Sequence, residues 1–216
     1  VGTGEHMNEH PFVEEWPSWS ERARGLVESI DIMRTYWESD EFFSYDGQQY
    51  SFDPVYAYEQ PVTEQQIICS ATGPDSARLA ARHADHLVTL DVVPDVKERV
   101  IDVYHDHGGD GDVYMQTVGG YGDADALIDR IRHSFASTLK PESFDELDPR
   151  ELQRTAETAT DAEITDAFLI AETPDDVLAW IDEQEERGVD HAVITDVSYE
   201  QSAFYAEAAT EILPSL

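Results

Sequence analysis

Apolar residues recur every three or four positions in the segment 18–38, a spacing typical of an amphipathic helix. The apolar positions are Leu26, Ile30, Met33 and Trp37. Ser18 precedes the segment and Glu21 follows three residues later, which is the pattern of a helix capping box. The sequence therefore predicts a helix over about 18–38 with one apolar face.

Aromatic and polar residues then alternate in the segment FFSYDGQQYSF, on both sides of Asp46-Gly47. Alternation around an Asp-Gly pair predicts a β-hairpin. The hairpin interrupts an otherwise regular order of elements, so we expect it to be an excursion on the surface of the fold.

From Gln66 onward, short apolar runs alternate with segments of helical spacing. The expected strands are 67–71, 86–90, 113–118 and 191–195. Helical spacing follows the first three strands, and further helical segments are expected up to about residue 170. Thr173 is expected to cap another helix that begins at Pro174 and ends at Gly188.

Repeated strand–helix units predict a parallel sheet covered by helices. If Val1-Gly2 is the end of a strand, the chain holds five strands, whereas a closed (β/α)8 TIM barrel has eight. We expect one domain, 1–216, that is the last five units of such an α/β barrel, with the hairpin inserted and the first strands lacking. The alternative is a complete, open, doubly wound sheet of five strands.

Acidic residues outnumber basic ones by 47 to 13 in the 216 residues, which gives a formal net charge of -34. This charge argues against nucleic-acid binding, which needs a basic surface. Lys97 and Lys140 are the two lysines of the chain. An acidic surface with so little lysine indicates a halophilic protein whose folding depends on screening by salt.

No run approaches the ~20 apolar residues of a membrane span, and no signal peptide is visible. We therefore expect a soluble, cytoplasmic protein with no membrane partner. The single cysteine, Cys69, lies in the apolar run IICSA and is interpreted as a buried strand thiol rather than a nucleophile.

The segment VGTGEHMNE at residues 1–9 has the character of a binding site. Two glycines flank Thr3, a carboxylate follows at Glu5, and an amide follows at Asn8. Glycine is needed where the backbone turns sharply or lies against a ligand. A site-like turn at the first residues favours the interpretation that preceding barrel strands are missing.

The order of motifs resembles the luciferase-like flavin and deazaflavin oxidoreductases. The order is GTGExxNE, a helix, the hairpin around YDGQQY, SATGPDSARLAARHADH and DHAVITD. The chain is most similar to the branch that uses the deazaflavin coenzyme F-420 (F420), typified by F420-dependent glucose-6-phosphate dehydrogenases. The resemblance implies a barrel, a homodimer, and hydride transfer between the coenzyme and a small organic substrate.

The same resemblance implies roles for residues of the first motif. Glu5 would serve as a general acid or base beside the reactive face of the coenzyme, and a partly buried carboxylate can be tuned for this task. Thr3, Gly4 and Asn8 match positions that contact the ring or its tail. Turn geometry alone is the alternative explanation for these three residues.

A second site segment lies at the turn after the strand 67–71. Thr72, Gly73, Asp75 and Ser76 precede or open a helix there, where free backbone N–H groups can hold a phosphate. The resemblance places the phosphate-bearing tail of the coenzyme at this turn. The backbone of Thr72 and Gly73 is the better candidate, because the Asp75 carboxylate competes with a phosphate.

The substrate positions depart from the sugar-phosphate enzymes. Leu90, Val93 and Ser202 stand where those enzymes have residues that hold the phosphate, so the sequence argues against glucose 6-phosphate. Arg154 keeps a positive charge at a phosphate-binding position and is the predicted substrate-binding residue. An ion pair with Glu157 on the same helix is the alternative for Arg154.

His105 and His107, with Asp110 and Asp112, resemble a metal cluster only in composition. Their spacing matches no recognised zinc pattern, so we expect a solvated acidic loop and no metal. Two alternatives to the deazaflavin enzyme stay open. One is a monooxygenase that uses flavin mononucleotide (FMN) on the same fold, and the other is a non-catalytic, truncated barrel remnant that survives by dimerising.

Overall fold

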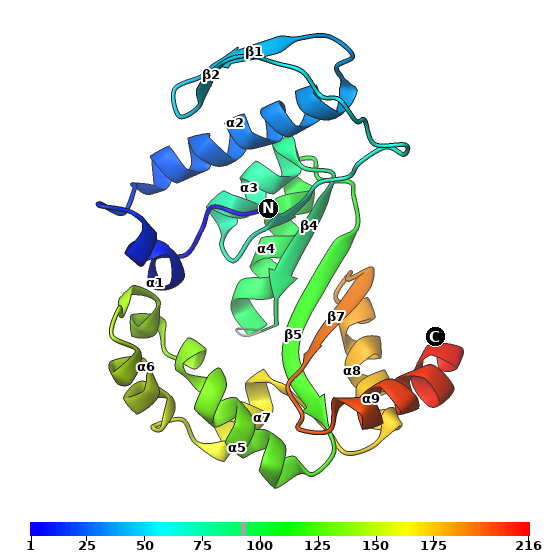
Figure 1. The fold of residues 1–216 in the computed structure, drawn as a ribbon. Coiled ribbons are helices and arrows are strands. Elements are labelled where there is room, and N and C mark those ends of the chain that lie inside the picture. The colour runs from blue at the N-terminus through cyan, green and yellow to red at the C-terminus, as the bar shows by residue number, and fades with distance from the viewer. Residues whose placement is uncertain (92–93) are drawn as a thin grey trace.

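The computed structural model describes residues 1–91 and 94–216, without the side chains of Met7, Asn8, 94–97 and 141–142. The helices are α1 (His6–Glu9), α2 (Trp19–Glu38), α3 (Pro74–His83), α4 (Pro94–Asp106), α5 (Ala124–Ser134), α6 (Pro149–Ala156), α7 (Asp161–Ala167), α8 (Pro174–Glu186) and α9 (Gln201–Glu207). The strands are β1 (Phe43–Asp46), β2 (Ser51–Val55), β3 (Ile68–Ser70), β4 (His86–Leu90), β5 (Val113–Tyr121), β6 (Leu169–Ala171) and β7 (His191–Asp196). Figure 1 shows their arrangement.

The main sheet is parallel and follows the order of the chain. β3 pairs with β4, β4 pairs with β5, and β5 pairs with β7. In the last of these pairs Tyr114 lies opposite His191. The first residue extends this order, because Val1 N–H donates to the Ile68 carbonyl at 2.8 Å and Ser70 N–H donates to the Val1 carbonyl at 2.7 Å. Val1 therefore pairs with β3 like the end of a parallel strand, as the sequence predicts.

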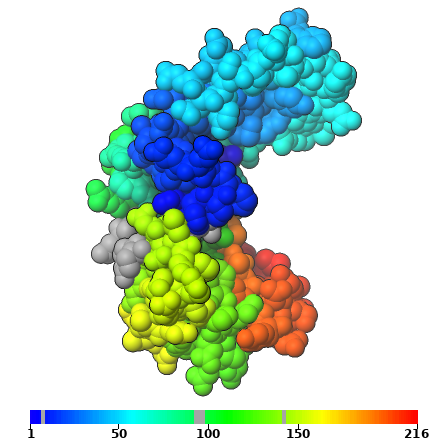
Figure 2. Space-filling view, turned by 60° about the vertical axis from the view of Figure 1, so that its left-hand side comes forward, coloured from blue at the N-terminus to red at the C-terminus, as the bar shows by residue number. Residues whose placement is uncertain are grey.

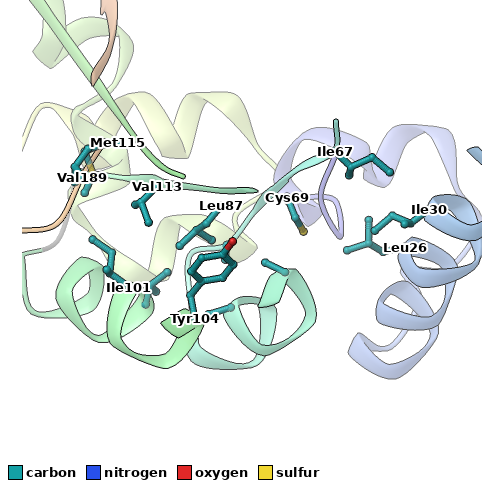
Figure 3. Close-up of a cluster of buried hydrophobic side chains, with 14 residues drawn as sticks. Leu26, Ile30, Ile67, Cys69, Leu87, Ile101, Tyr104, Val113, Met115 and Val189 are labelled. Atoms are coloured by element: carbon teal, nitrogen blue, oxygen red, sulfur yellow. The ribbon is translucent and has the colours of Figure 1, made fainter. Parts of the chain in front are cut away.

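Helices cover one face of this sheet. Leu87 and Val113 are fully buried there, next to Ile101 and Tyr104 of α4, and Leu26 of α2 completes the same core (Figure 3). The alternate residues of the strands, such as Val88 and Gln116, are only half-buried. One covered face and an unreversed strand order are features of a barrel wall, whereas a doubly wound sheet reverses its order and is covered on both faces. The doubly wound alternative is therefore wrong.

The sheet is not closed within the described residues: Val1 lies at one end, and at the other both β6 and β7 pair with β5. Strand β6 was not predicted. It pairs with Gly119–Tyr121 at the end of β5, and only Phe168 separates it from α7, so its apolar residues continue the helical segment that was expected up to about residue 170. None of the described helices is long and apolar enough to span a bilayer.

The predicted helix ends are confirmed. Ser18 and Glu21 form a reciprocal capping box at α2, and Thr173 begins α8 with a second box. Gly188 follows α8 with a φ of 81°, the left-handed conformation that glycine adopts without strain. Local chemistry therefore sets where these helices begin and end.

The predicted hairpin lies over α2 and projects from the body of the molecule (Figures 1 and 2). Its turn is held by the buried carboxylate of Glu28 on α2, which accepts N–H bonds from Gln48 at 2.8 Å and from Gln49 and Tyr50 at 2.9 Å each. Burial alone would raise the pKa of Glu28, but the three N–H donors outweigh it and hold this pKa below its usual range. Glu28 thus anchors the hairpin to the helix.

We expect Glu28→Gln to loosen the hairpin, because an amide nitrogen cannot accept the backbone N–H bonds that a carboxylate oxygen accepts. Limited chymotrypsin digestion should then cut faster at the hairpin tyrosines. In the parent protein the protection should weaken as the pH falls, since a lowered pKa means that the ionised form stabilises the fold. Glu38→Gln, at an exposed position of the same helix, is the control. Equal cleavage of all three proteins would contradict this prediction.

Candidate functional site

The turn at residues 2–5 follows the Val1 pairing and lies beside the C-terminal end of β3. Gly4 has a φ of 81°, and a Cβ atom at this position would lie 2.7 Å from Oε2 of Glu9. The Glu9 carboxylate accepts the Glu5 N–H at 3.1 Å, and the Glu9 N–H donates to the Glu5 carbonyl at 3.0 Å. The positive φ therefore favours glycine at position 4, and Glu5 is the N-cap residue of α1.

This turn shares an open cavity of about 310 Å³ with the segment that follows β3. Its lining residues come from both segments, and they are Gly2, Thr3, Gly4, Glu5, Glu9, Ser70, Thr72 and Ser76. The structure thus brings together the two segments that the sequence singled out, although about 70 residues separate them. In a parallel sheet this follows from adjacent strands ending at the same edge.

Three lining residues, Gly2, Glu9 and Ser70, were not predicted as site residues. Glu9 stands four positions after Glu5, one helical turn away, so its contact with that turn could have been inferred from spacing. The strand end at Ser70 gives no comparable signal. The side chain of Asn8 lies outside the described residues.

The start of α3 borders the cavity. The Ser76 hydroxyl accepts the Gly73 N–H at 3.3 Å and donates to the Gly73 carbonyl at 2.9 Å. No atom lies within 4 Å of the place where a Cβ of Gly73 would stand, so a ligand could approach this backbone closely. Asp75 forms an ion pair with Arg78, which offsets the negative charge that disfavours a phosphate there. Gly73 and Asp75 do not line the cavity itself.

The cavity wall is acidic. Glu5 and Glu9 supply two carboxylates, both side chains are exposed, and the residues that line the cavity include neither lysine nor arginine. Such a wall suits a neutral or cationic group better than an anion.

Arg154 lies apart from this cavity, on α6. Its guanidinium pairs with Glu151 at 2.7 Å, one helical turn earlier, so the partner within the described part of α6 is Glu151 and not the expected Glu157. Leu90 is half-buried at the end of β4, Ser202 is exposed on α9, and Val93 lies outside the described residues.

His105 and His107, at the end of α4 and just after it, contact backbone carbonyls rather than each other. Nδ1 of His105 lies 2.9 Å from the Gly109 carbonyl, and Nδ1 of His107 lies 2.9 Å from the Val103 carbonyl. Asp112 contacts Nε2 of His191 on β7 at 3.1 Å. The described side chains contain no group of three or more that could hold a metal ion.

Cys69 is fully buried in β3, as predicted. Burial raises the pKa of its thiol, so the thiolate needed for nucleophilic attack is disfavoured. The candidate chemistry therefore rests on carboxylates, hydroxyls and backbone groups.

Known proteins are similar to this chain in sequence and in architecture. An F420-dependent glucose-6-phosphate dehydrogenase of Microbacterium testaceum is 30% identical over 227 residues, which cover 100% of this chain and 67% of that protein. The corresponding enzyme of Nakamurella multipartita is 27% identical with the same coverage.

A solved structure of an F420-dependent secondary alcohol dehydrogenase, in complex with an F420-acetone adduct, superposes with a TM-score of 0.86 and 27% identity. It covers 100% of this chain, which spans 68% of that structure. The F420-dependent tetrahydromethanopterin reductase of Methanopyrus kandleri shares the fold, with a TM-score of 0.74 at 16% identity. Residues 1–191 match the luciferase-like monooxygenase family. The chain therefore belongs to the luciferase-like monooxygenase family and has its barrel-type fold.

Proposed function

We propose that this protein is an oxidoreductase that transfers a hydride between coenzyme F420 and a small organic substrate. The observation that supports it most directly is the cavity in which the Glu5 turn meets the turn before α3. The proposal also rests on the F420-dependent enzymes that are 27–30% identical to the whole chain.

The lining of the cavity fits one end of a flat, polar coenzyme. Gly2 and Gly4 present backbone rather than side chains along one wall, while Thr72 and Ser76 bring hydroxyl groups to the other. A volume of about 310 Å³ lies at the lower end of the range for ligand sites, so it suits the ring rather than the entire molecule. When bound, the deazaflavin supplies the carbon that accepts or gives the hydride.

The residues of the chain would bind and orient this ring and handle the proton. Glu5 is the proposed general acid or base, while Thr3, Gly4 and Asn8 are the proposed contacts to the ring or its tail. The backbone of Thr72 and Gly73, with Ser76 behind it, is proposed to hold the phosphate, and Asp75 is held aside by Arg78.

We propose an uncharged alcohol or carbonyl compound as the substrate. Among the described residues, the cavity lining contains no cationic side chain. Leu90 is apolar and offers no group that binds phosphate. The Asp91 carboxylate, which accepts a hydrogen bond from Trp180 at 2.8 Å, stands just after β4 and would repel an anion. Arg154, the cationic candidate for substrate binding, remains a prediction for a substrate that reaches α6.

The setting of the enzyme is also a proposal. We infer a homodimer in the cytoplasm of a salt-adapted cell, with no nucleic-acid or membrane partner. The net charge of -34 supports the exclusion of nucleic acid, because both partners would be strongly negative.

Titration with F420 and with FMN, followed by fluorescence in molar potassium chloride, tests the cofactor. We expect F420 to bind and FMN to bind much more weakly. Tighter binding of FMN would favour the monooxygenase alternative, and binding of neither would favour the non-catalytic remnant. Turnover of a secondary alcohol but not of glucose 6-phosphate is expected to follow, since the site has no phosphate-binding cation at its wall.

A further inference from the structure

Arg22 of α2 connects the helix to the Glu5 turn. Its Nε atom donates to the backbone carbonyl of Thr3 at 3.2 Å, and its Nη1 atom donates to the carbonyl of Pro17 at 2.8 Å. One guanidinium therefore joins the turn at residues 2–5 to the segment that leads into α2. Both acceptors are backbone atoms, so the contact fixes the path of the chain rather than a side chain.

Trp16 adds a second connection, on the other side of Glu5. The guanidinium of Arg22 lies over the Trp16 ring, 4.9 Å from its centroid, which is the geometry of a cation–π contact. The ring of His6, the residue after Glu5, stacks on Trp16 with centroids 5.0 Å apart and planes 19° apart. The chain is thus held at Thr3 and at His6, the positions that flank the Gly4-Glu5 pair.

We propose that Arg22 and Trp16 are positioning residues that together hold the Glu5 carboxylate at the cavity. This inference rests on the function proposed above, in which Glu5 handles a proton. Gly4 gives the turn its left-handed bend but also its freedom, since glycine loses the most conformational entropy on ordering. Bracing the backbone on both sides restricts that freedom.

The chemistry of the brace requires arginine. A planar guanidinium presents several donors in a fixed fork and stacks on an aromatic ring at the same time. A lysine ammonium is a point charge that cannot place two donors and a stacked plane in this arrangement. Arg24, two positions along, is exposed on the same helix and takes no part in these contacts, so it is a matched control.

The first test needs no coenzyme. Hydrogen–deuterium exchange of the amides of residues 5–9 would be measured in the parent protein and in Arg22→Gln, Arg22→Lys and Arg24→Gln. Loss of a hydrogen bond to a charged donor is expected to speed exchange about 10- to 100-fold in both Arg22 variants. Arg24→Gln should match the parent. Unchanged exchange in the Arg22 variants would overturn the brace whether or not the enzyme uses F420.

The second test separates positioning from binding. A misplacement of about 1 Å costs on the order of 10²-fold in rate, so Arg22→Gln should lower kcat by about 10- to 100-fold with little change in KM. Trp16→Leu should act in the same direction, whereas Trp19→Leu should have a small effect, because its ring lies farther from the guanidinium, at 5.8 Å, and does not stack on His6. Equal losses in both tryptophan variants, or a loss confined to KM, would refute the proposal. If the parent protein has no F420-dependent turnover, the proposed function fails while the exchange experiment still decides the brace.

Discussion

Replacing Glu5 with glutamine is expected to lower turnover by about 10²–10⁴-fold, the usual contribution of a general acid or base. Glutamine keeps the shape of the side chain and its ability to form hydrogen bonds but cannot titrate. The Glu5 backbone is held by the Glu9 carboxylate, so the substitution should leave the turn intact. Coenzyme affinity should therefore stay nearly unchanged, and kcat should carry the loss.

The kinetics should be measured across the pH range, with Glu14→Gln as the control. Glu14 is exposed in the segment between α1 and α2, and the cavity lining does not include it. Full turnover of Glu5→Gln at every pH, or a loss of coenzyme binding in step with activity, would show that Glu5 is a structural residue of the turn.

Lowering the salt concentration is expected to unfold this protein. With a net charge of -34, the compact chain repels itself, and several of the few cations already pair with carboxylates, as Lys140 does with Glu163, Arg132 with Asp161 and Arg187 with Glu183. Screening must therefore come from dissolved ions. The Debye length falls from about 10 Å at 0.1 M to about 3 Å at 1 M salt. At molar salt, repulsion between neighbouring surface charges is therefore largely screened.

Thermal unfolding should be followed by circular dichroism from low salt to molar potassium chloride, and Tm should rise steeply. Sucrose serves as the control, because it stabilises compact states by exclusion without screening charge. A Tm that is insensitive to potassium chloride, or that rises as much in sucrose, would contradict the halophilic interpretation.

Periodic patterns and local caps made most of the fold predictable. The helices α2 and α8 and the hairpin β1–β2 have repeated spacing or capping residues, so their existence and bounds follow from nearby sequence. Strand β6 follows α7 after the single residue Phe168, so its apolar residues could not be told from the end of that helix without the pairing to β5.

The candidate site shows the same division. The motifs at residues 2–5 and 72–76 were predicted as site segments, and residues of both line the cavity. The two segments lie side by side because the parallel strands before them end at the same edge of the sheet. The contact from Arg22 to Thr3 spans 19 positions and joins a helix to a turn, so no periodic pattern reveals it. The contact between Asp112 and His191 joins residues 79 positions apart, so the sequence pattern does not reveal it either.

The two hydrogen bonds between Val1 and β3 have a thermodynamic consequence for ligand binding. They align one wall of the cavity with the other, so opening of the pairing between Val1 and β3 would move Glu5, the proposed proton-transfer group, away from the turn at Thr72 and Gly73. A ligand that touches both walls binds only the form in which Val1 is paired with β3. Thermodynamic linkage then requires that the bound ligand stabilise this pairing against opening. Each tenfold excess of ligand over its Kd deepens that protection by about 1.4 kcal/mol, so occupancy of the site and order of the strand end rise together.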